Sequence, residues 1–333
     1  MKIGVVGAGS WGTSLANVLA KKGYTVTLWA HEAELVGYMR TYGENYQYLP
    51  GIKLHRNLCP SADLKDAVSR DVVVLVPPSQ RMRAVLEKAA PGFNPEAVVV
   101  SASKGIENTT LELMSEVIAK TLQGRHDKKK TAFLSGPTFA REIALEVPSA
   151  AVVASECEDI ATMARDLFST DYFRIYSNDD VIGTEVGGAL KNIIALAAGV
   201  CDGLKYGNNT RAALITRGLA EMKRIGIALG AKPETFAGLA GMGDLVLTCT
   251  GELSRNRTVG IALGEGQKLD AILAHMKMVA EGVETARSAY HLAHKLDVDV
   301  PIINEMYALL YENKDPRRAV VELMRRTLKA EYI

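Results

Sequence analysis

The sequence contains few cysteines, and their positions exclude the sites that cysteines most often build. Only four occur in 333 residues, and they stand far apart, at Cys59, Cys157, Cys201 and Cys249. No Cys-x-x-Cys pair and no cluster of acidic residues indicates metal binding, so we expect no metal. No serine elbow or cysteine–histidine arrangement indicates covalent hydrolysis. Scattered thiols are typical of reduced intracellular proteins.

Excess charge and long apolar runs are also missing. The 39 basic and 38 acidic residues leave a net charge of +1, which gives no field to recruit nucleic acid or an anionic membrane. The one basic run, "RHDKKK" at 125–130, has no aromatic neighbours and is typical of a solvated loop. The longest apolar run, residues 193–201, is too short to cross a bilayer, and no leader fits before a strand starting at residue 2. We therefore expect a cytoplasmic protein.

The first half of the sequence does contain a regular alternation of strands and helices. Apolar β-forming runs predict strands at residues 2–6, 25–30, 72–77, 97–103, 131–136, 149–155 and 173–177. Helical patterns separate most of them, including residues 79–90, 110–122 and 158–169. This alternation predicts an α/β fold of the Rossmann type, with a doubly wound, mostly parallel sheet. Ligands of such sheets bind at the carboxyl ends of the strands.

After residue 178 the pattern changes to helices without a convincing strand. Helical stretches are expected at residues 180–206, 210–230, 268–275, 282–296, 301–312 and 315–328. A chain of 333 residues is long enough for two separate cores. Residues 1–177 are therefore predicted to form a dinucleotide-binding domain, and residues 178–333 an all-helical domain for substrate binding and catalysis.

The stretch "KIGVVGAGSWG" at residues 2–12 joins the first strand to the first helix. Gly7 suits a tight turn, Gly9 allows close approach of a ligand, and Gly12 lets the helix lie against the strand. Unpaired amides at the start of the helix favour a phosphate group. A glycine-rich turn without a ligand is the alternative, but the strand before it and the helix after it favour a nucleotide.

The helix expected from residue 180 places an amine and an amide beside two glycines. Gly187 and Gly188 lie on one face with Lys191 and Asn192, roughly opposite an apolar stripe. Each mid-helix glycine costs about 1 kcal/mol relative to alanine, so the fold keeps them where something comes close. Either another helix packs there, with a lysine that reaches solvent, or a flat ring lies on the glycines with Lys191 and Asn192 beside the reacting atom.

Two further stretches carry polar residues that suit a ligand. The lysine of "SASKG", Lys104, follows a strand at the edge where this fold binds ligands, although a solvated loop lysine is the alternative. Asp244 and Thr248 are four residues apart, so on a helix they share a face. Ser254 resembles an N-cap that places Arg255 and free amides at a helix start, which suits either a phosphate or a capped surface helix.

At this point the sequence resembles the bacterial type of NAD(P)-dependent glycerol-3-phosphate dehydrogenase. Seven motifs occur in the family's order along nearly the whole chain: "GAGSWGTSLA", "SASKGIE", "LSGPTFAREIA", "EVGGALKNIIALAAG", "LAGMGDLVLTCTG", "SRNR" and "VAEGVETA". The resemblance implies reversible hydride transfer between a nicotinamide and C2 of dihydroxyacetone phosphate or sn-glycerol 3-phosphate. The usual direction makes sn-glycerol 3-phosphate for glycerophospholipid synthesis.

The resemblance also implies roles for individual residues. Lys191 corresponds to the general acid–base at the C2 oxygen, which fits the need of a nascent alkoxide for a proton. The other implied catalytic residues are Lys104, Asn192, Asp244 and Thr248. The implied substrate contacts are Lys104, Gly136, Thr138, Lys191, Asp244, Ser254, Arg255 and Asn256. The implied cofactor contacts, together with the glycines of the fingerprint, are Gly7, Gly9, Ser10, Trp11, Gly12, His31, Lys104, Ala140, Arg255, Val279 and Glu281.

The cofactor is expected to be NADP(H), with NAD(H) also used. An NAD-specific site places an acid at the end of the second strand. Here "TLWAHEAE" has His31 at that position and Glu32 one residue later. A histidine there accepts a 2′-phosphate, whereas Glu32 pointing inward favours the ribose hydroxyl of NADH.

Two other functions remain open on the residues alone. One is another two-domain dehydrogenase that acts on a hydroxy acid or sugar acid, against which the phosphate-type residues Ser254–Asn256 argue. The other is a regulator that senses NAD(P)H without turnover, which has no need of Lys191 and Asn192 beside the glycines. The oligomeric state is open, and a homodimer is the expectation we carry forward.

Overall fold

The structure is a computed structural model that describes residues 1–276, 279–328 and 330–331. Eight strands form one sheet in the order β3-β2-β1-β4-β5-β6-β7-β8. Their bounds are β1 (Lys2–Val6), β2 (Thr25–Trp29), β3 (Leu58–Ser61), β4 (Val72–Leu75), β5 (Val98–Ser101), β6 (Thr131–Ser135), β7 (Ser149–Ala154) and β8 (Phe173–Asn178). All neighbours are parallel except β6 and β7, which are antiparallel. The predicted mostly parallel sheet is confirmed.

Seven of these strands match the predicted ones, and β3 was missed. Its sequence, "LCPS", is short and contains a proline, which cannot donate to a central ladder. The strand is tolerated because it lies at the edge of the sheet, where it pairs with β2 alone, from Val26 opposite Leu58 to Trp29 opposite Ser61.

Helices cover both faces of the sheet, as a doubly wound fold requires. The helices of the first half are α1 (Ser10–Lys21), α2 (Ala33–Tyr42), α3 (Leu64–Val68), α4 (Met82–Ala89), α5 (Met114–Thr121), α6 (Ala140–Ala144) and α7 (Glu158–Phe168). Strand β4 shows why both faces are covered, because its side chains alternate between two cores. Val72 and Val74 pack with the core of α1 and α7, while Val73 and Leu75 pack with that of α3, α4 and α5.

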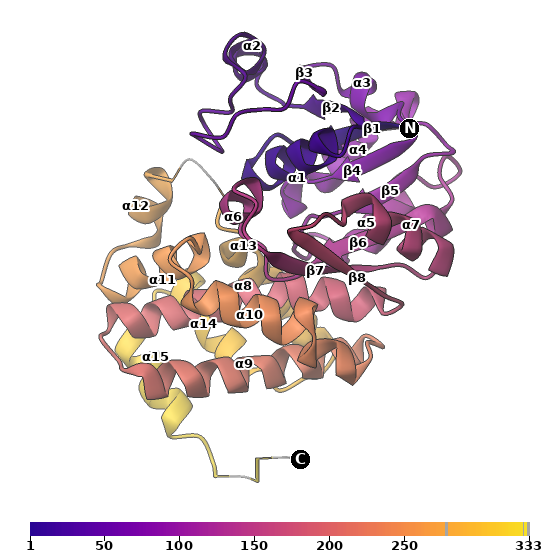
Figure 1. Ribbon diagram of the computed structural model, residues 1–333. Helices are drawn as coiled ribbons and strands as arrows, with labels where there is room; N and C mark the ends of the chain where they lie inside the picture. Colours follow the sequence, from indigo (N-terminus) through magenta and orange to yellow (C-terminus); the bar gives the residue numbers. More distant parts are fainter. Residues whose placement is uncertain (277–278, 329, 332–333) are drawn as a thin grey trace.

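The second half of the chain forms helices and no strand among its described residues after β8, as predicted. Its helices are α8 (Val181–Gly203), α9 (Asn208–Ala228), α10 (Asp244–Thr250), α11 (Arg255–Gly264), α12 (Leu269–Ala274), α13 (Glu281–Lys295), α14 (Pro301–Tyr311) and α15 (Pro316–Met324). Figure 1 shows them in pink, orange and yellow below the indigo and magenta sheet domain, with α8 along the boundary. Polar contacts cross this boundary, such as the bond from the Ser115 amide to Glu185 Oε1 at 2.9 Å.

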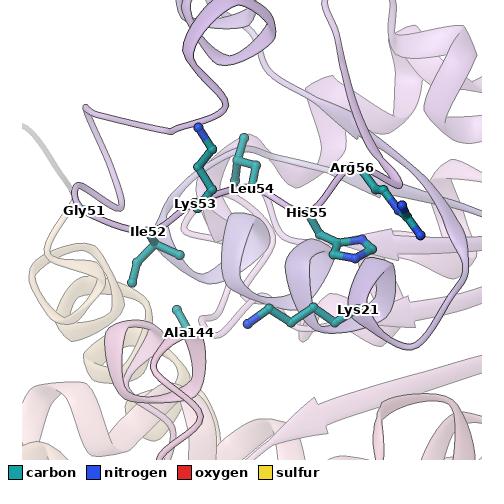
Figure 2. Close-up of a pocket in the computed structure, with 8 residues that line it drawn as sticks. All are labelled: Lys21, Gly51, Ile52, Lys53, Leu54, His55, Arg56 and Ala144. Atoms are coloured by element: carbon teal, nitrogen blue, oxygen red, sulfur yellow. The ribbon is translucent and has the colours of Figure 1, made fainter.

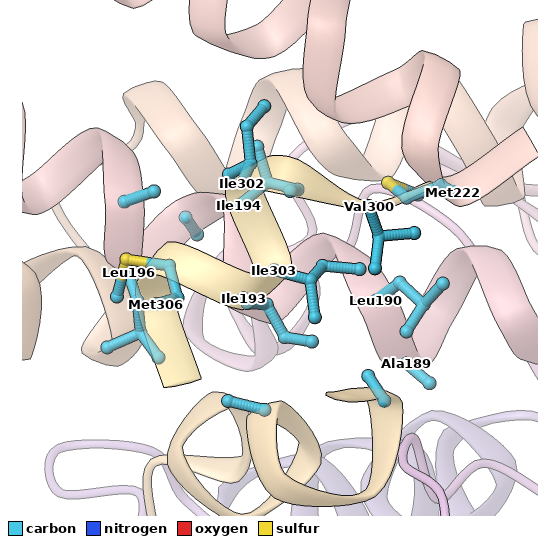
Figure 3. Packing of buried hydrophobic residues seen from close by; sticks show 14 of the residues in the cluster. Ala189, Leu190, Ile193, Ile194, Leu196, Met222, Val300, Ile302, Ile303 and Met306 are labelled. Carbon is cyan, nitrogen blue, oxygen red and sulfur yellow. The ribbon is translucent and has the colours of Figure 1, made fainter. Parts of the chain in front are cut away.

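Helix α8 lies at the centre of the helical core. Leu190, Ile193, Ile194 and Leu196 from α8 pack against residues of α9 and α14, among them Met222 and Ile303 (Figure 3). The prediction that no apolar segment is long enough to cross a bilayer was wrong, because the apolar run is part of α8, a helix of 23 residues. Of its most apolar window, 89% is buried inside the protein, as in a core helix.

Candidate active site

The glycine-rich turn has the geometry that a dinucleotide site needs. Gly7 has φ +112°, which favours glycine, and a Cβ at Gly12 would lie 1.9 Å from the Gly7 carbonyl oxygen. A Cβ at Gly9 would meet nothing within 4 Å, so the backbone is open there. Gly9 is also the N-cap of α1 and its helix start has no side-chain cap. A helix start without a side-chain cap, beside an open backbone, fits a pyrophosphate group.

Across the boundary between the two halves, two lysines share one buried carboxylate. Asp244, at the start of α10, is fully buried, and its Oδ2 accepts from Lys104 Nζ at 2.6 Å. Its Oδ1 accepts a hydrogen bond from Lys191 Nζ of α8. Thr248, one turn along α10, accepts from Lys191 Nζ at 3.0 Å. The predicted shared face of Asp244 and Thr248 is therefore confirmed, and Lys104 is not a solvated loop lysine.

The buried position of Lys191 changes its acidity. Only 7% of the residue is exposed, and removal from water disfavours the ammonium form. Burial lowers the pKa of Lys191 to about 7, the Asp244 carboxylate opposes this change, and the nearby Lys104 ammonium adds to it. An amine with a pKa near neutrality can both give and take a proton at physiological pH.

The strand-end loop at residues 134–144 contributes the next groups beside Lys104. Lys104 Nζ donates to the Gly136 carbonyl oxygen at 3.2 Å, and Thr138 Oγ1 donates to the same oxygen at 3.2 Å. Gly136 has φ +136°, and a Cβ there would lie 2.9 Å from Ala151 Cα, so the loop turns tightly over β7. Ala140 then begins α6. The structure therefore brings Gly136 and Thr138 next to Lys104.

Asn192 and Asn256 form a second polar link, between α8 and α11. Asn256 Nδ2 donates to Asn192 Oδ1 at 2.8 Å, and Asn256 Oδ1 accepts from the Gly282 amide at 3.0 Å. Ser254 is the N-cap of α11 as predicted, and its hydroxyl accepts from the Arg257 amide at 3.3 Å. These contacts fix the position of Asn192, one residue from Lys191.

The two glycines of α8 are explained by close packing inside the protein. A Cβ at Gly187 would lie 2.4 Å from the Ala240 carbonyl oxygen, and one at Gly188 would lie 2.7 Å from Ser135 Oγ. The structure therefore favours the packing alternative over a ring resting on the glycines. That alternative also expected a lysine reaching solvent, which was wrong, because Lys191 is buried in its ion pair.

Arg255 and Glu281 both come from the helical half of the chain. The sequence analysis did not identify Ser79, which contacts Glu281. Arg255 is exposed, and its Nη1 donates to the Val279 carbonyl oxygen at 3.0 Å. Burial raises the pKa of Glu281, whose Oε2 accepts from Ser79 Oγ at 2.7 Å. Ser79 is fully buried and fills the space beside Gly105, where a Cβ would lie 2.3 Å from its Oγ. The only sequence signal for Ser79 was its place after a strand end.

The two residues at the end of β2 that were considered for the cofactor, His31 and Glu32, have different contacts. His31 and Glu32 are both exposed after the buried Ala30. The His31 ring lies 6.2 Å from the Trp29 ring, centroid to centroid. Glu32 Oε1 accepts a hydrogen bond from the Tyr48 hydroxyl at 2.9 Å.

Trp11, beside the glycine turn, packs edge-on against Phe173 of β8, with 6.5 Å between the ring centroids.

A cavity of about 440 Å³ lies between the end of α1, the segment 51–56 and α6, and neither Lys104 nor Lys191 lines it. In Figure 2 the Lys21 side chain extends toward Ala144. Lys21 is already paired with Glu146 at 2.7 Å.

The described residues contain no group of three or more histidine, cysteine, aspartate or glutamate side chains that could hold a metal ion. A His-x-x-His spacing, which was missed at the level of the sequence, occurs at His291 and His294 of α13. Both histidines are exposed, and their rings contact Tyr290, at 5.2 Å and 4.2 Å between centroids. With no third ligand among the described residues, this spacing does not make a metal site.

Comparisons with known proteins agree along the whole chain. Two family models match: the N-terminal model of NAD-dependent glycerol-3-phosphate dehydrogenase over residues 2–161, and the C-terminal model over residues 180–321. A glycerol-3-phosphate dehydrogenase, NAD(P)+, of Syntrophotalea carbinolica is 59% identical over 332 residues, which is 99% of each chain. The protein of that name from Citrifermentans bemidjiense is 58% identical, over 100% of this chain and 99% of its own.

A crystal structure of glycerol-3-phosphate dehydrogenase from Coxiella burnetii has the same architecture. The two chains superpose with a TM-score of 0.93 at 40% sequence identity, over 98% of this chain and 99% of that one. The enzyme from Saccharomyces cerevisiae superposes with a TM-score of 0.82 at 28% identity, over 98% of this chain and 99% of its own. The predicted α/β Rossmann-type fold with a helical second half is thereby confirmed.

Proposed function

The chain belongs to the NAD-dependent glycerol-3-phosphate dehydrogenase family, and we propose that it interconverts dihydroxyacetone phosphate and sn-glycerol 3-phosphate with NADPH or NADH. It is an NAD(P)-dependent oxidoreductase. The observation that carries the proposal is the pair of lysines on one buried carboxylate, between a dinucleotide turn and a helical half. Neither a hydroxy-acid dehydrogenase nor a regulator that only senses the nucleotide accounts for the two family matches together.

Lys191 acts as the general acid in the reducing direction. When bound, the reduced nicotinamide supplies a hydride to C2 of the ketone. Lys191 Nζ gives its proton to the C2 oxygen, so the ketone becomes a secondary alcohol and the lysine a neutral amine. In the oxidising direction the neutral amine takes the proton back. Asp244 and Thr248 hold Nζ in place through their contacts with it.

Lys104 stabilises the negative charge that develops on the C2 oxygen. Its ammonium lies on the other oxygen of Asp244, so both cations are held at fixed positions before the reaction begins. A preorganised cation lowers the barrier without reorganisation at the moment of reaction. Asn192, held by Asn256, supplies an amide at the same site.

The start of α11 holds the phosphate of the substrate. Ser254, Arg255 and Asn256 combine a hydroxyl, a guanidinium and a helix N-terminus, which together suit a phosphate dianion. Gly136 and Thr138 form the facing wall beside Lys104. We assign the substrate contacts to these residues and to Lys104, Lys191 and Asp244.

The cofactor lies along the first half of the chain, with its pyrophosphate at the glycine turn. Gly7, Gly9, Ser10, Trp11 and Gly12 form that turn and the first helical residues. The remaining contacts are assigned to His31, Lys104, Ala140, Arg255, Val279 and Glu281. NADP(H) is preferred over NAD(H), because the exposed imidazole of His31 suits a 2′-phosphate while Glu32 is engaged by Tyr48.

The proposal extends to the wider setting of the protein. Residues 1–177 form the dinucleotide-binding domain, and residues 178–333 the helical domain for substrate binding and catalysis. The protein works in the cytoplasm, as a homodimer, and supplies sn-glycerol 3-phosphate for glycerophospholipid synthesis.

A substrate comparison tests the proposed function. NADPH consumption is followed at the absorbance band of the reduced nicotinamide, with dihydroxyacetone phosphate, unphosphorylated dihydroxyacetone or a 2-oxo acid as the acceptor. We expect kcat/KM to be highest for dihydroxyacetone phosphate. Preferred reduction of the 2-oxo acid would support the hydroxy-acid dehydrogenase instead, and NADPH binding without turnover of any acceptor would support the sensor.

A further inference from the structure

The end of β2 carries a histidine, which suits the 2′-phosphate of NADPH, and a carboxylate, which suits the 2′-hydroxyl of NADH. In sheets of this topology, the residue at this strand end reads the 2′ position of the adenosine ribose. A carboxylate there accepts a hydrogen bond from the 2′-hydroxyl of NADH and repels the 2′-phosphate of NADPH. His31 and Glu32 are both exposed at this edge, so what holds Glu32 decides which cofactor is favoured.

Glu32 is held by a tyrosine from the segment that follows α2. The Tyr48 hydroxyl donates to Glu32 Oε1 at 2.9 Å, and the Tyr48 ring packs against the core of the first half. Burial and the Glu32 carboxylate both raise the pKa of Tyr48, so its hydroxyl stays protonated and able to donate near neutral pH. A carboxylate that already accepts from a phenol competes less well for a ribose hydroxyl.

The position of Tyr48 is fixed to the glycine turn itself. Asn45 is fully buried, and its Nδ2 donates to the Ala8 carbonyl oxygen and to Thr13 Oγ1, both at 2.8 Å. Asn45 Oδ1 accepts from the Tyr48 amide at 3.1 Å. Through these bonds, the segment that carries Tyr48 is attached to the turn between β1 and α1. The Tyr48 hydroxyl therefore meets Glu32 from a rigid support.

We propose that Tyr48 is a specificity-determining residue, whose hydroxyl engages Glu32 and so keeps that carboxylate from the ribose, in favour of NADPH. This inference rests on the proposed use of NADPH and NADH by this site. It assigns Tyr48 no contact with the reacting atoms. Tyr48 acts through Glu32, so removing Glu32 removes the effect of Tyr48.

The experiment is a double-mutant cycle with two readouts. Dissociation constants of NADPH and NADH are measured by calorimetry, and kcat/KM with dihydroxyacetone phosphate is measured for each cofactor. The variants are Tyr48→Phe, Glu32→Gln and the double variant. Tyr46→Phe is the matched control, because Tyr46 lies in the same segment, half exposed, and packs against Tyr38 with 4.3 Å between centroids.

We expect Tyr48→Phe to reduce the preference for NADPH over NADH by roughly threefold to tenfold, the range for loss of one hydrogen bond. The NADPH-to-NADH ratio of kcat/KM then falls, and the ratio of the two dissociation constants rises by the same factor. In the Glu32→Gln background the same change leaves both ratios constant, and Tyr46→Phe leaves them at the wild-type values. Thermal unfolding of each variant checks that the fold is intact.

The inference is overturned by an unchanged cofactor preference in Tyr48→Phe, by a shift of the preference further toward NADPH, or by an equal effect of Tyr48→Phe with and without Glu32. Equal weakening of both cofactors, with a lower melting temperature, would also overturn it, because Tyr48 would then act only on the fold. Loss of the proposed function looks different: the wild type then fails to reduce dihydroxyacetone phosphate with either cofactor.

Discussion

The pH dependence of catalysis follows from the position of Lys191. The ordinary pKa of a lysine is 10.5, and burial lowers that of Lys191 to about 7. The reduction consumes the ammonium form, so kcat/KM for dihydroxyacetone phosphate should fall about tenfold per pH unit well above pH 7. At pH 9 roughly one lysine in a hundred still carries its proton. The oxidation consumes the neutral amine, so its kcat/KM should rise with pH and level off above pH 7.

The assay measures both directions from pH 7 to 10 at saturating nucleotide. A phosphate monoester has its second pKa near 6, so the substrate stays a dianion across this range. Asp244 opposes the lowering of the Lys191 pKa, so in Asp244→Asn the falling limb should begin at a lower pH. A reduction rate that stays level from pH 7 to 9 would refute the reasoning, because Lys191 would then titrate like an ordinary lysine.

Two other features make separate predictions. Gly12→Ala places a Cβ 1.9 Å from the Gly7 carbonyl oxygen, so it should lower the melting temperature. Gly9→Ala meets no atom within 4 Å, so it should keep the wild-type melting temperature and weaken NADPH binding, and a destabilised Gly9→Ala would show that the open space is misassigned. Arg255→Ala should raise KM for dihydroxyacetone phosphate by roughly tenfold or more, the loss of a charge-assisted contact, with much less effect on unphosphorylated dihydroxyacetone. Equal losses for the two ketones would mean that Arg255 does not bind the phosphate, and NADPH affinity is measured in parallel.

Local sequence was enough to predict most of the sheet, because its strands are encoded by short apolar runs. The valines of β4 and β5 are buried on both faces and read as strands without tertiary information. β3 was missed because "LCPS" has weak strand propensity and forms only where β2 offers an edge. The antiparallel direction of β7 was also beyond a sequence pattern, since it depends on the path of the chain through the short α6.

The roles of the glycines in the turn were predicted for a similar reason. Each glycine answers a local requirement of the strand–turn–helix unit: the structure has a tight turn at Gly7, where φ is +112°, and a close approach of helix and strand at Gly12. Gly187 and Gly188 show where local patterns stop being sufficient. A mid-helix glycine indicates close approach, but the sequence does not reveal whether Ala240, Ser135 or a ligand approaches.

The contact between Lys104 and Asp244 depends on the tertiary structure. The two residues are 140 positions apart and come from different halves of the chain. Their roles were inferred from resemblance to a family, and they stay predictions until variants are assayed. Ser79, Asn45 and Tyr48 were not singled out, because a serine that begins a short 3-10 helix, and an asparagine and a tyrosine in a loop, have no periodicity that marks them before the fold supplies their partners.

The central claim is that Lys191, held between Asp244 and Thr248, donates the proton in the reduction of dihydroxyacetone phosphate. Lys191→Met tests it most directly, because methionine keeps much of the apolar volume and removes the amine. The account predicts that kcat falls on the order of 10²–10⁴-fold, the usual loss of a general acid, while the dissociation constant of NADPH stays within twofold of the wild type. A folded Lys191→Met protein that reduces dihydroxyacetone phosphate at a near-normal kcat would contradict it.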